Sequence, residues 1–278
     1  MTSSDRTNRW AGLTLDRPRV MGILNVTPDS FSDGGSRIGA QAAISAGFAM
    51  AEAGADIIDV GGESTRPGAD VVSAEAEQAR ILPVIRALAA ANILVSVDTR
   101  NAATMRAALA AGARIINDIS GLAHDPGSLP MVAEHGCPVV LMHMRGTPGT
   151  MSAEANYQDV VSEVRAELAN RVDAALAAGI LSDRIVIDPG LGFAKHAEHS
   201  LAVLRGLPDL LDLGYPVLIG LSRKSFIGTV SEEPRAGQRL GGSLAAGLFA
   251  VLRGASILRV HDVRETVQAL RVWRTLFE

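Results

Sequence analysis

Eight short apolar runs, each long enough for one strand, alternate along the chain with longer segments that have helical spacing. The runs are rich in Val, Ile or Leu with little polar alternation, which is typical of parallel strands buried on both faces. They are Val20–Leu24, Asp56–Val60, Leu94–Val97, Arg114–Asn117, Val139–Met142, Arg184–Ile187, Pro216–Ile219 and Ser256–Val260. Eight strand-then-helix units in 278 residues predict an α/β fold, a (β/α)8 TIM barrel in a single domain. The alternative, an open doubly wound sheet, normally has fewer strands.

An Ala-rich amphipathic segment follows each run. These segments are Ala40–Ala53, Ala74–Ala90, Ala102–Ala111, Leu129–His135, Gln158–Ala178, Ser200–Leu213, Gln238–Arg253 and Asp262–Leu276. Several are followed by a glycine (Gly54, Gly112, Gly179, Gly254), the residue that favours a left-handed helix C-cap. We expect residues 1–19 to form an N-terminal extension or cap and residues 20–278 to form the barrel.

The charge balance and hydropathy of the chain exclude several classes of partner. A formal net charge of -4 provides no basic field for nucleic acid or an anionic membrane, so neither is expected as a partner. The first nineteen residues have no apolar signal core, and no apolar stretch reaches the roughly 18 residues of a membrane span. We therefore expect a cytoplasmic protein.

The connections from strand to helix are long and polar, and in a barrel they lie on the rim where active sites form. The first, Asn25–Gly35, contains Phe31, and the second, Gly61–Gly68, contains Thr65 and Arg66. Loops of this length are often lids that close over a substrate. Two ordinary solvent loops are the alternative, but an arginine, a threonine and a phenylalanine between glycines exceed what solvation requires.

Polar side chains stand where the third, fourth and sixth runs end: Asp98, Asn117 and Asp188. Polar groups at such buried positions cost free energy unless they are hydrogen-bonded. Asp98 could instead cap the following helix. Convergence of three acceptor groups from different strands favours a ring that offers several N–H donors, such as an aminopyrimidine.

A second group of polar residues follows the seventh and eighth runs. Arg259 and His261 are two residues apart and so point to the same side of a strand end. Lys224 lies in the loop after the seventh run, and the loops after strands seven and eight are the frequent phosphate site of this fold. A solvated surface pair is the alternative for Arg223-Lys224. The sequence contains no P-loop, nucleophile elbow, dinucleotide fingerprint or zinc-ligand spacing.

Taken together, these strings resemble the motif set of the dihydropteroate synthase family, in order from about Val20 to the C-terminus. The strings are Asn25–Gly35, Gly61–Gly68, Ser96–Thr99, Asn117–Gly121, Met142–Met151, Asp188–Phe193, Ser222–Gly228 and Arg259–Val263. The resemblance implies a pterin-binding barrel and a transferase of folate biosynthesis. Such an enzyme condenses 6-hydroxymethyl-7,8-dihydropterin diphosphate with para-aminobenzoate to give 7,8-dihydropteroate and diphosphate.

The resemblance also implies roles for individual residues. Asn25 would ligate the cofactor Mg²⁺. Asp98, Asn117, Asp188 and Lys224 would bind the pterin, and Arg259 and His261 the diphosphate. The aminobenzoate pocket, where sulfonamides compete, would be framed by Phe31, Pro67, Phe193, Lys224 and Ser225. Thr65, which also binds substrate, and Arg66 would join Asp98, Asp188 and Lys224 as catalytic residues. A homodimer is implied as well.

Two departures from the family pattern are small: Arg145 stands where a neutral polar residue is frequent, and Ala194 where glycine is common. Two alternatives remain, a pterin-binding methyltransferase domain and a non-catalytic pterin-binding paralogue. The first should not need the diphosphate residues, and the second should lose Asn25 or the Thr65-Arg66 pair.

Overall fold

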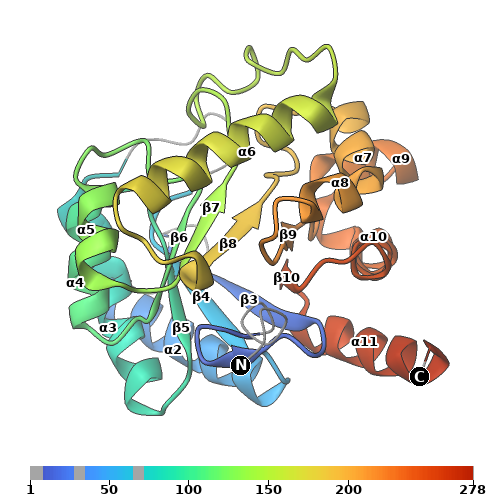
Figure 1. Cartoon of the computed structure of the whole chain (residues 1–278). Coiled ribbons are helices and arrows are strands. Elements are labelled where there is room, and N and C mark those ends of the chain that lie inside the picture. The colour runs from blue at the N-terminus through green and yellow to red at the C-terminus, as the bar shows by residue number, and fades with distance from the viewer. Residues whose placement is uncertain (1–8, 28–34, 65–71, 278) are drawn as a thin grey trace.

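A barrel of parallel strands forms the centre of the molecule (Figure 1). The computed structural model describes residues 9–27, 35–64 and 72–277. Its strands are β3 (Arg19–Asn25), β4 (Ile57–Gly61), β5 (Val95–Asp98), β6 (Ile115–Asp118), β7 (Val139–Met142), β8 (Ile185–Asp188), β9 (Leu218–Gly220) and β10 (Ile257–Val260). They are paired in the order β8-β7-β6-β5-β4-β3-β10-β9, and a parallel bridge between Ile187 and Val217 joins the two ends. The predicted (β/α)8 barrel is therefore confirmed, and each predicted run overlaps one strand.

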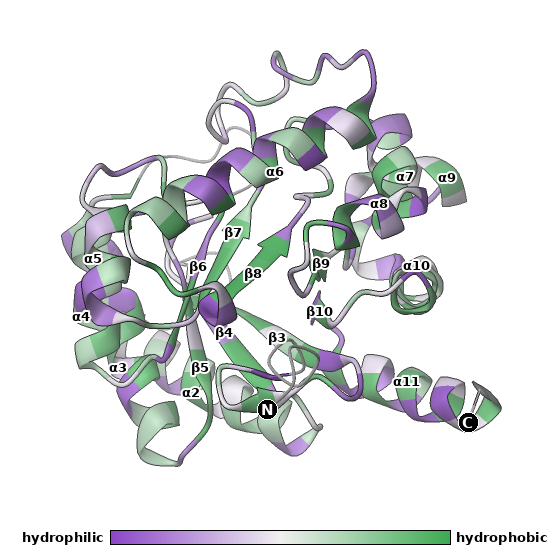
Figure 2. Cartoon of the chain, viewed as in Figure 1, coloured by the Kyte–Doolittle hydropathy of each residue, from purple (hydrophilic) through white to green (hydrophobic). Residues whose placement is uncertain are grey.

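Helices surround the strands and turn their apolar faces toward them (Figure 2). Those that match predicted segments are α2 (Gly35–Glu52), α3 (Ala74–Ala90), α4 (Ala102–Ala110), α5 (Ser128–His135), α6 (Val160–Ala177), α10 (Leu240–Leu252) and α11 (Val263–Phe277). The glycines predicted as C-caps, Gly54, Gly112, Gly179 and Gly254, all have positive φ angles, between 97° and 103° for three and 109° for Gly112. None of the helices among the described residues has the length and apolarity needed to cross a membrane.

The structure differs from the sequence prediction at two helices. The single helix expected over Ser200–Leu213 is two helices, α7 (Ala197–Arg205) and α8 (Leu207–Leu211). The break falls at Gly206, and Pro208 lies in the first turn of α8, where its missing N–H costs nothing. A short helix that the sequence did not predict, α9 (Ser225–Ser231), begins directly after Lys224.

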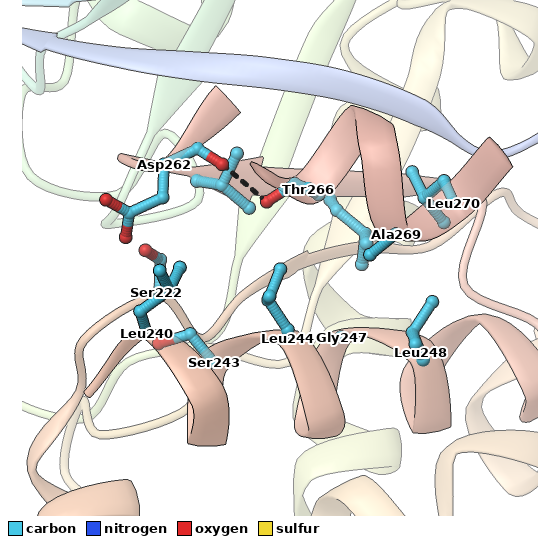
Figure 3. Close-up of a pocket in the computed structure, with 12 residues that line it drawn as sticks. Ser222, Leu240, Ser243, Leu244, Gly247, Leu248, Asp262, Thr266, Ala269 and Leu270 are labelled. Carbon is cyan, nitrogen blue, oxygen red and sulfur yellow. Dashed lines mark hydrogen bonds between the residues drawn. The ribbon is translucent and has the colours of Figure 1, made fainter. Parts of the chain in front are cut away.

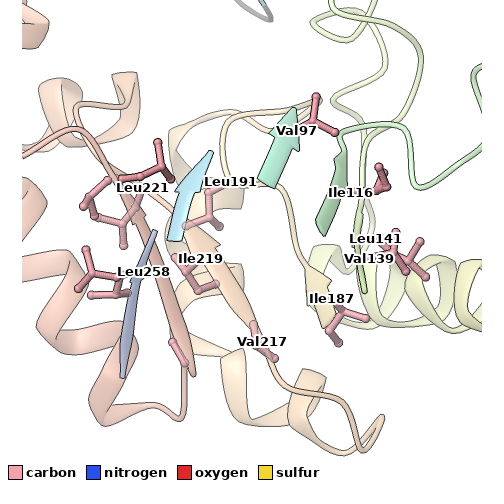
Figure 4. Packing of buried hydrophobic residues seen from close by; sticks show 14 of the residues in the cluster. Val97, Ile116, Val139, Leu141, Ile187, Leu191, Val217, Ile219, Leu221 and Leu258 are labelled. Atoms are coloured by element: carbon pink, nitrogen blue, oxygen red, sulfur yellow. The ribbon is translucent and has the colours of Figure 1, made fainter. Parts of the chain in front are cut away.

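Side chains alternate between the two faces of each strand and so build two cores. Outward residues such as Val97, Leu141, Ile187 and Leu258 pack against the helices (Figure 4). Inward residues near the strand starts form a separate cluster, which fills the lower barrel: Met21, Ile57, Ile115, Val140, Val186, Leu218 and Ile257. The next inward positions, two residues further along each strand, are therefore the ones that approach the rim.

An N-terminal hairpin closes the barrel at the end opposite the rim. Its strands, β1 (Arg9–Trp10) and β2 (Leu13–Thr14), pair antiparallel. Trp10 is 2% exposed and packs on the inward cluster of the lower barrel. Its indole Nε1 donates to the carbonyl of Arg184 over 2.8 Å, which satisfies the only polar atom of a buried ring.

Candidate active site

Strand parity brings the predicted polar residues to one interior. Asn117, Asp188 and Arg259 each lie two residues after a member of the inward cluster, so their side chains share its face. Asp98 pairs in register with Asn117 on one side and with Gly61 on the other. Residues from separate strand ends thus meet above the apolar layer, as the sequence predicted.

Arg259 forms the centre of a hydrogen-bonded network in this interior. Its Nε donates to Oδ2 of Asp59 over 2.6 Å, and its Nη2 donates to Oδ2 of Asp98 over 2.5 Å. The side-chain amide of Asn117 donates to the same Oδ2 of Asp59 over 2.9 Å. One guanidinium and one carboxylate therefore fix the relative positions of two residues predicted to bind the pterin.

Asp59 was not among the residues predicted from the sequence. It lies in the middle of β4, its side chain is fully buried, and its Oδ1 has no hydrogen-bond partner among the described residues. A signal was available: Asp59 is a charged residue inside the apolar run Asp56–Val60, two positions after the inward Ile57. A charge there requires a buried partner.

Burial and charge together set the protonation of the network. Burial raises the pKa of Asp98 to about 7, Arg259 opposes the rise, and the neighbouring charge of Asp59 adds to it. For Arg259, burial disfavours the cation, but Asp59 and Asp98 outweigh this and hold its pKa above the ordinary value. The arginine is therefore a permanent cation beside a carboxyl that titrates near neutral pH. The alternative of Asp98 as a helix cap is not what the structure has, because the N–H of Ala102 is bound by Asp125.

Asp188 is the last residue of β8, and the β8 loop, which we define as residues 189–196, follows it. Its Oδ1 accepts a hydrogen bond from the N–H of Gly190 over 2.7 Å. Burial raises the pKa of Asp188, while the N–H of Gly190 and the charge of Lys224 lower it. The carboxylate is thus desolvated but aligned, ready for a donor-rich ligand.

Lys224 follows β9 and contacts two residues of the β8 loop. Its Nζ donates to the carbonyl of Leu191 and lies 4.3 Å from the ring centre of Phe193, a cation–π distance. Burial lowers the pKa of Lys224 to about 8, and Asp188 opposes this. Phe193 and Lys224, both predicted for the aminobenzoate pocket, are therefore in contact.

The remaining predicted residues fall into two groups. His261 accepts or donates at Nδ1 with the hydroxyl of Ser222 over 3.1 Å, Ser225 is the first residue of α9, and Asn25 is the last of β3, in register with Gly61. Phe31, Thr65, Arg66 and Pro67 lie outside the described residues.

Asn25 is the only residue predicted to bind a metal. In the described part of the chain, no group of three or more His, Cys, Asp or Glu residues could hold a metal ion. Asn25 shares the inward face of β3 with Met21, four residues earlier, and offers a neutral amide oxygen at the rim. Mg²⁺ commonly takes one or two protein oxygens and completes its shell with phosphates and water, so this donor suits a metal that arrives with a diphosphate.

A pocket lies away from this interior, between α10, α11 and the outward face of β10 (Figure 3). Leu244, Leu248 and Leu270 make it largely apolar, and Thr266 donates to the carbonyl of Asp262 at its polar end. It contains none of the residues predicted to bind substrate, so we assign it to helix packing.

Comparison with known proteins agrees with the geometry of this site. A family model described as "Pterin binding enzyme" matches residues 21–261. The dihydropteroate synthase of Neisseria meningitidis serogroup B is 48% identical over 268 residues, which cover 94% of each chain. The chain belongs to the dihydropteroate synthase family. The Escherichia coli K12 member is 47% identical and covers 94% of this chain and 92% of its own.

Solved structures of this family share the fold. The Xanthomonas albilineans dihydropteroate synthase with 4-aminobenzoic acid has a TM-score of 0.90 and 52% identity over 95% of each chain. A structure of that organism's enzyme with 7,8-dihydropteroate has a TM-score of 0.87 and 49% identity over the same share of each chain. As a family member, the chain is an enzyme, a transferase. These relatives favour the synthase over a pterin-binding methyltransferase domain.

Proposed function

We propose that this enzyme condenses 6-hydroxymethyl-7,8-dihydropterin diphosphate with para-aminobenzoate, releasing diphosphate in folate biosynthesis. The observation that carries the proposal is the acceptor-rich interior in which Asp98, Asn117 and Asp188 converge above an apolar layer. A pterin has an N–H-rich aminopyrimidine edge and flat apolar faces, which such an interior complements.

The pterin ring binds between Asp188 and the network around Arg259. Asp188 takes the aminopyrimidine edge, since a buried carboxylate accepts paired N–H groups well. Asn117 is held by Asp59 and so presents its amide in one orientation. Lys224 lies beside the β8 loop and contributes a donor to a ring acceptor.

The diphosphate occupies the neighbouring side of the rim. Arg259 and His261 share one face of the β10 end, and the Arg259 guanidinium uses Nε and Nη2 for the two aspartates. Asn25 would hold Mg²⁺, which neutralises charge on the leaving group when it is bound. Arg259 therefore links the ring half of the site to the anion half.

The aminobenzoate pocket is framed by Phe193, Lys224 and Ser225, with Phe31 and Pro67 from the two long loops. Phe193, whose ring contacts Lys224, supplies an apolar wall for the aromatic ring. The Yersinia pestis dihydropteroate synthase has been solved with a sulfonamide drug. Sulfonamides compete for this pocket because they share the aromatic amine.

The reaction follows a loose path in which the C–O bond to diphosphate breaks first. The pterin methyl cation that forms is stabilised by the anionic forms of Asp98 and Asp188. Arg259 and His261 stabilise the charge that develops on the departing oxygen. The aromatic amine then attacks and loses its proton to water, so no strong general base is needed. Thr65 and Arg66, on the second loop, help to exclude water from the cation.

The proposal extends to assembly and location. The chain forms a homodimer through α10 and α11, whose exposed apolar side chains include Leu252 (58%), Val272 (58%) and Leu276 (75%). It acts in the cytoplasm on small molecules and binds neither nucleic acid nor a membrane. Light scattering coupled to size exclusion tests the dimer: a mass near 29 kDa instead of twice that value would contradict it.

A diphosphate-release assay, run with and without para-aminobenzoate, tests the activity. The expected result is rapid release and 7,8-dihydropteroate formation with both substrates, and slow release from the pterin diphosphate alone because the cation forms and is trapped by water. No release under either condition would favour a non-catalytic paralogue. Diphosphate release with both substrates present, but without formation of 7,8-dihydropteroate, would contradict the condensation.

A further inference from the structure

Lysine is confined to two positions of this chain. Of the 26 lysines and arginines in the sequence, only Lys195 and Lys224 are lysines. Both lie on the rim, in the loops that follow β8 and β9. The other 24 are arginines, so these two sites use a compact ammonium with three donors where a planar guanidinium is otherwise the rule. Lys224 belongs to the substrate site proposed above, whereas Lys195 is not among the residues assigned to that site.

The ammonium of Lys195 is buried and has its donors directed at three acceptors. The residue is 7% exposed. Its Nζ donates to the carbonyl of Gly190 over 3.2 Å and to that of Phe193 over 3.1 Å. The third partner is Nδ1 of His143, 2.8 Å away. Because an ammonium has three N–H groups, this geometry satisfies all of them.

A chain of side chains leads from Lys195 to the surface. His143 is 3% exposed, and its Nε2 lies 3.0 Å from Oε2 of Glu167 on α6. If Nδ1 accepts from Lys195, Nε2 carries the proton and donates to Glu167, and burial also lowers the pKa of His143. Arg145 donates to the other oxygen of Glu167 and, over 2.8 Å, to Glu163. Neutral His143 thus joins a buried ammonium to a half-exposed carboxylate.

The two carbonyls held by Lys195 belong to the turn that forms the substrate site. Gly190 has a φ of 65°, and its N–H donates to Oδ1 of Asp188 while its carbonyl accepts from Lys195. The N–H of Phe193 donates to the carbonyl of Gly190 over 3.0 Å. Ala194 completes the turn with a φ of 47°, a left-handed conformation that is unfavourable for a residue with a Cβ. An unfavourable backbone of this kind persists only where its surroundings determine it.

We propose that Lys195 is a positioning residue for pterin binding. Its hydrogen bond to the Gly190 carbonyl fixes Asp188, and its hydrogen bond to the Phe193 carbonyl fixes Phe193. His143 and Glu167 hold Lys195 in place. This inference rests on the proposed function. Lys195 touches no substrate, and its effect reaches the ligand through the peptide of Gly190. Its positive charge also lowers the pKa of Asp188 and so favours the carboxylate form.

The charge of Lys195 responds to groups on every side of it. Burial lowers the pKa of Lys195 to about 7. The carboxylates of Asp188 on β8 and Glu167 on α6 raise it, whereas Lys224 and Arg145 lower it. His143 faces the ammonium as a neutral acceptor. Loss of the Lys195 proton as the pH rises through about 7 therefore weakens the hydrogen bonds to both carbonyls.

Binding of 6-hydroxymethylpterin, followed by its fluorescence, tests the positioning role apart from catalysis. Lys195→Met keeps the length of the side chain and removes its donors. We expect its affinity for the pterin to fall about tenfold, as for one lost well-aligned hydrogen bond. Unchanged affinity in a variant with a native circular dichroism spectrum would overturn the proposal. Wild-type protein that binds no pterin would instead overturn the proposed function.

A matched pair of variants on α6 covers the case in which Lys195→Met does not fold. Glu167→Gln removes the charge that reaches Lys195 through His143, whereas Glu163→Gln removes a charge that contacts Arg145 but not His143. Loss of the Glu167 charge lowers the pKa of Lys195, so pterin affinity should decline at a lower pH in Glu167→Gln than in the wild type. Glu163→Gln should retain the wild-type profile. Identical profiles in the two variants would contradict the relay.

Nuclear magnetic resonance observes the ammonium directly, since ¹⁵N-lysine labelling of this chain gives only two side-chain signals. The signal that disappears in Lys195→Met is that of Lys195. If Lys195→Met does not fold, the signal whose pKa falls in Glu167→Gln is assigned to Lys195. We expect pterin to shift the Lys195 signal and raise its pKa, because the ligand excludes water and fixes the turn. A Lys195 signal that does not respond to saturating pterin would show a purely structural lysine.

Discussion

Nε of Arg259 lies 2.6 Å from Oδ2 of Asp59, so a carboxylate 200 residues away in the sequence orients the arginine assigned to the diphosphate. The same oxygen of Asp59 receives the amide of Asn117. Asp59 is therefore the common anchor of the ring half and the anion half of the site. This pairing also explains how a charged residue persists in the middle of a buried strand.

The fall of kcat/KM on the acidic side of its pH profile should depend on Asp98. Its pKa of about 7 means that kcat/KM for the pterin substrate falls as the pH drops through neutrality, because Asp98 becomes protonated and loses its negative charge. In Asp59→Asn the charge that raises the pKa of Asp98 is gone, so this acidic limb should move to lower pH. Steady-state kinetics between pH 5 and pH 9 measures the shift. A limb that stays in place or moves to higher pH would assign it to another group.

Arg259→Ala should destabilise the fold as well as weaken diphosphate binding. It leaves Asp59 and Asp98 buried without a cation, which typically costs about 3–5 kcal/mol of unfolding free energy. Removing the guanidinium also raises the pKa of Asp98 further. A carboxyl whose folded pKa is raised contributes stability below its unfolded pKa and loses it as the pH rises through the folded one.

The loss in Arg259→Ala should therefore be larger at pH 8 than at pH 5. Urea unfolding at both pH values measures it, with Arg253→Ala as a control, since the Arg253 side chain donates to an exposed carbonyl of Arg205. Equal losses at the two pH values would contradict the ion-pair explanation.

Asp188→Asn should impair pterin binding with little effect on folding. The asparagine oxygen can still accept from the N–H of Gly190, but its amide group would face the N–H donors of the ring. We expect kcat/KM to fall about a hundredfold, the combined effect of a lost charge-assisted bond and an unpaired donor. Asp183→Asn, at a half-exposed position of a turn before β8, serves as the control. Wild-type kinetics in Asp188→Asn would contradict its role at the pterin edge.

Trp10→Ala should separate stability from activity. The indole is buried against the lower barrel, so its removal should cost about 3–5 kcal/mol of unfolding free energy. The substrate site lies at the other end of the strands, so KM values of the folded variant should stay near those of the wild type. Trp10→Phe retains most of the packing and loses only the bond to the Arg184 carbonyl, and its deficit should be smaller. A large change in KM would show that the hairpin influences the rim.

The sequence predicts the barrel well because each strand carries its signal locally, as a short run of Val, Ile and Leu buried on both faces. Strand parity then orders Asn117, Asp188 and Arg259 along one interior face. The network itself was not predictable, since the pairing of Arg259 with Asp59 requires the register of strands at opposite ends of the chain. The role of Lys195 was not predictable for a similar reason: its hydrogen bond to His143 joins the loop after β7 to the β8 loop, and no sequence spacing indicates this contact.

The helix expected over Ser200–Leu213 was predicted only in part. The segment Ser200–Leu213 has continuous apolar spacing, which predicts one helix, but Gly206 and Pro208 favour a new start inside it. For the residues outside the described ranges, Phe31, Thr65, Arg66 and Pro67, the roles remain predictions based on family resemblance.

The inward apolar cluster and Trp10 beneath it close the lower end of the barrel, so the interior opens only at the rim. In the proposed site the pterin binds above the apolar layer and can enter and leave only past the rim, where para-aminobenzoate is also proposed to bind. We therefore expect the two substrates to bind in sequence, pterin diphosphate first, and the joined product to block a second pterin until it departs. A barrel closed at its lower end thus predicts an ordered binding of substrates and release of product, which product-inhibition patterns would test.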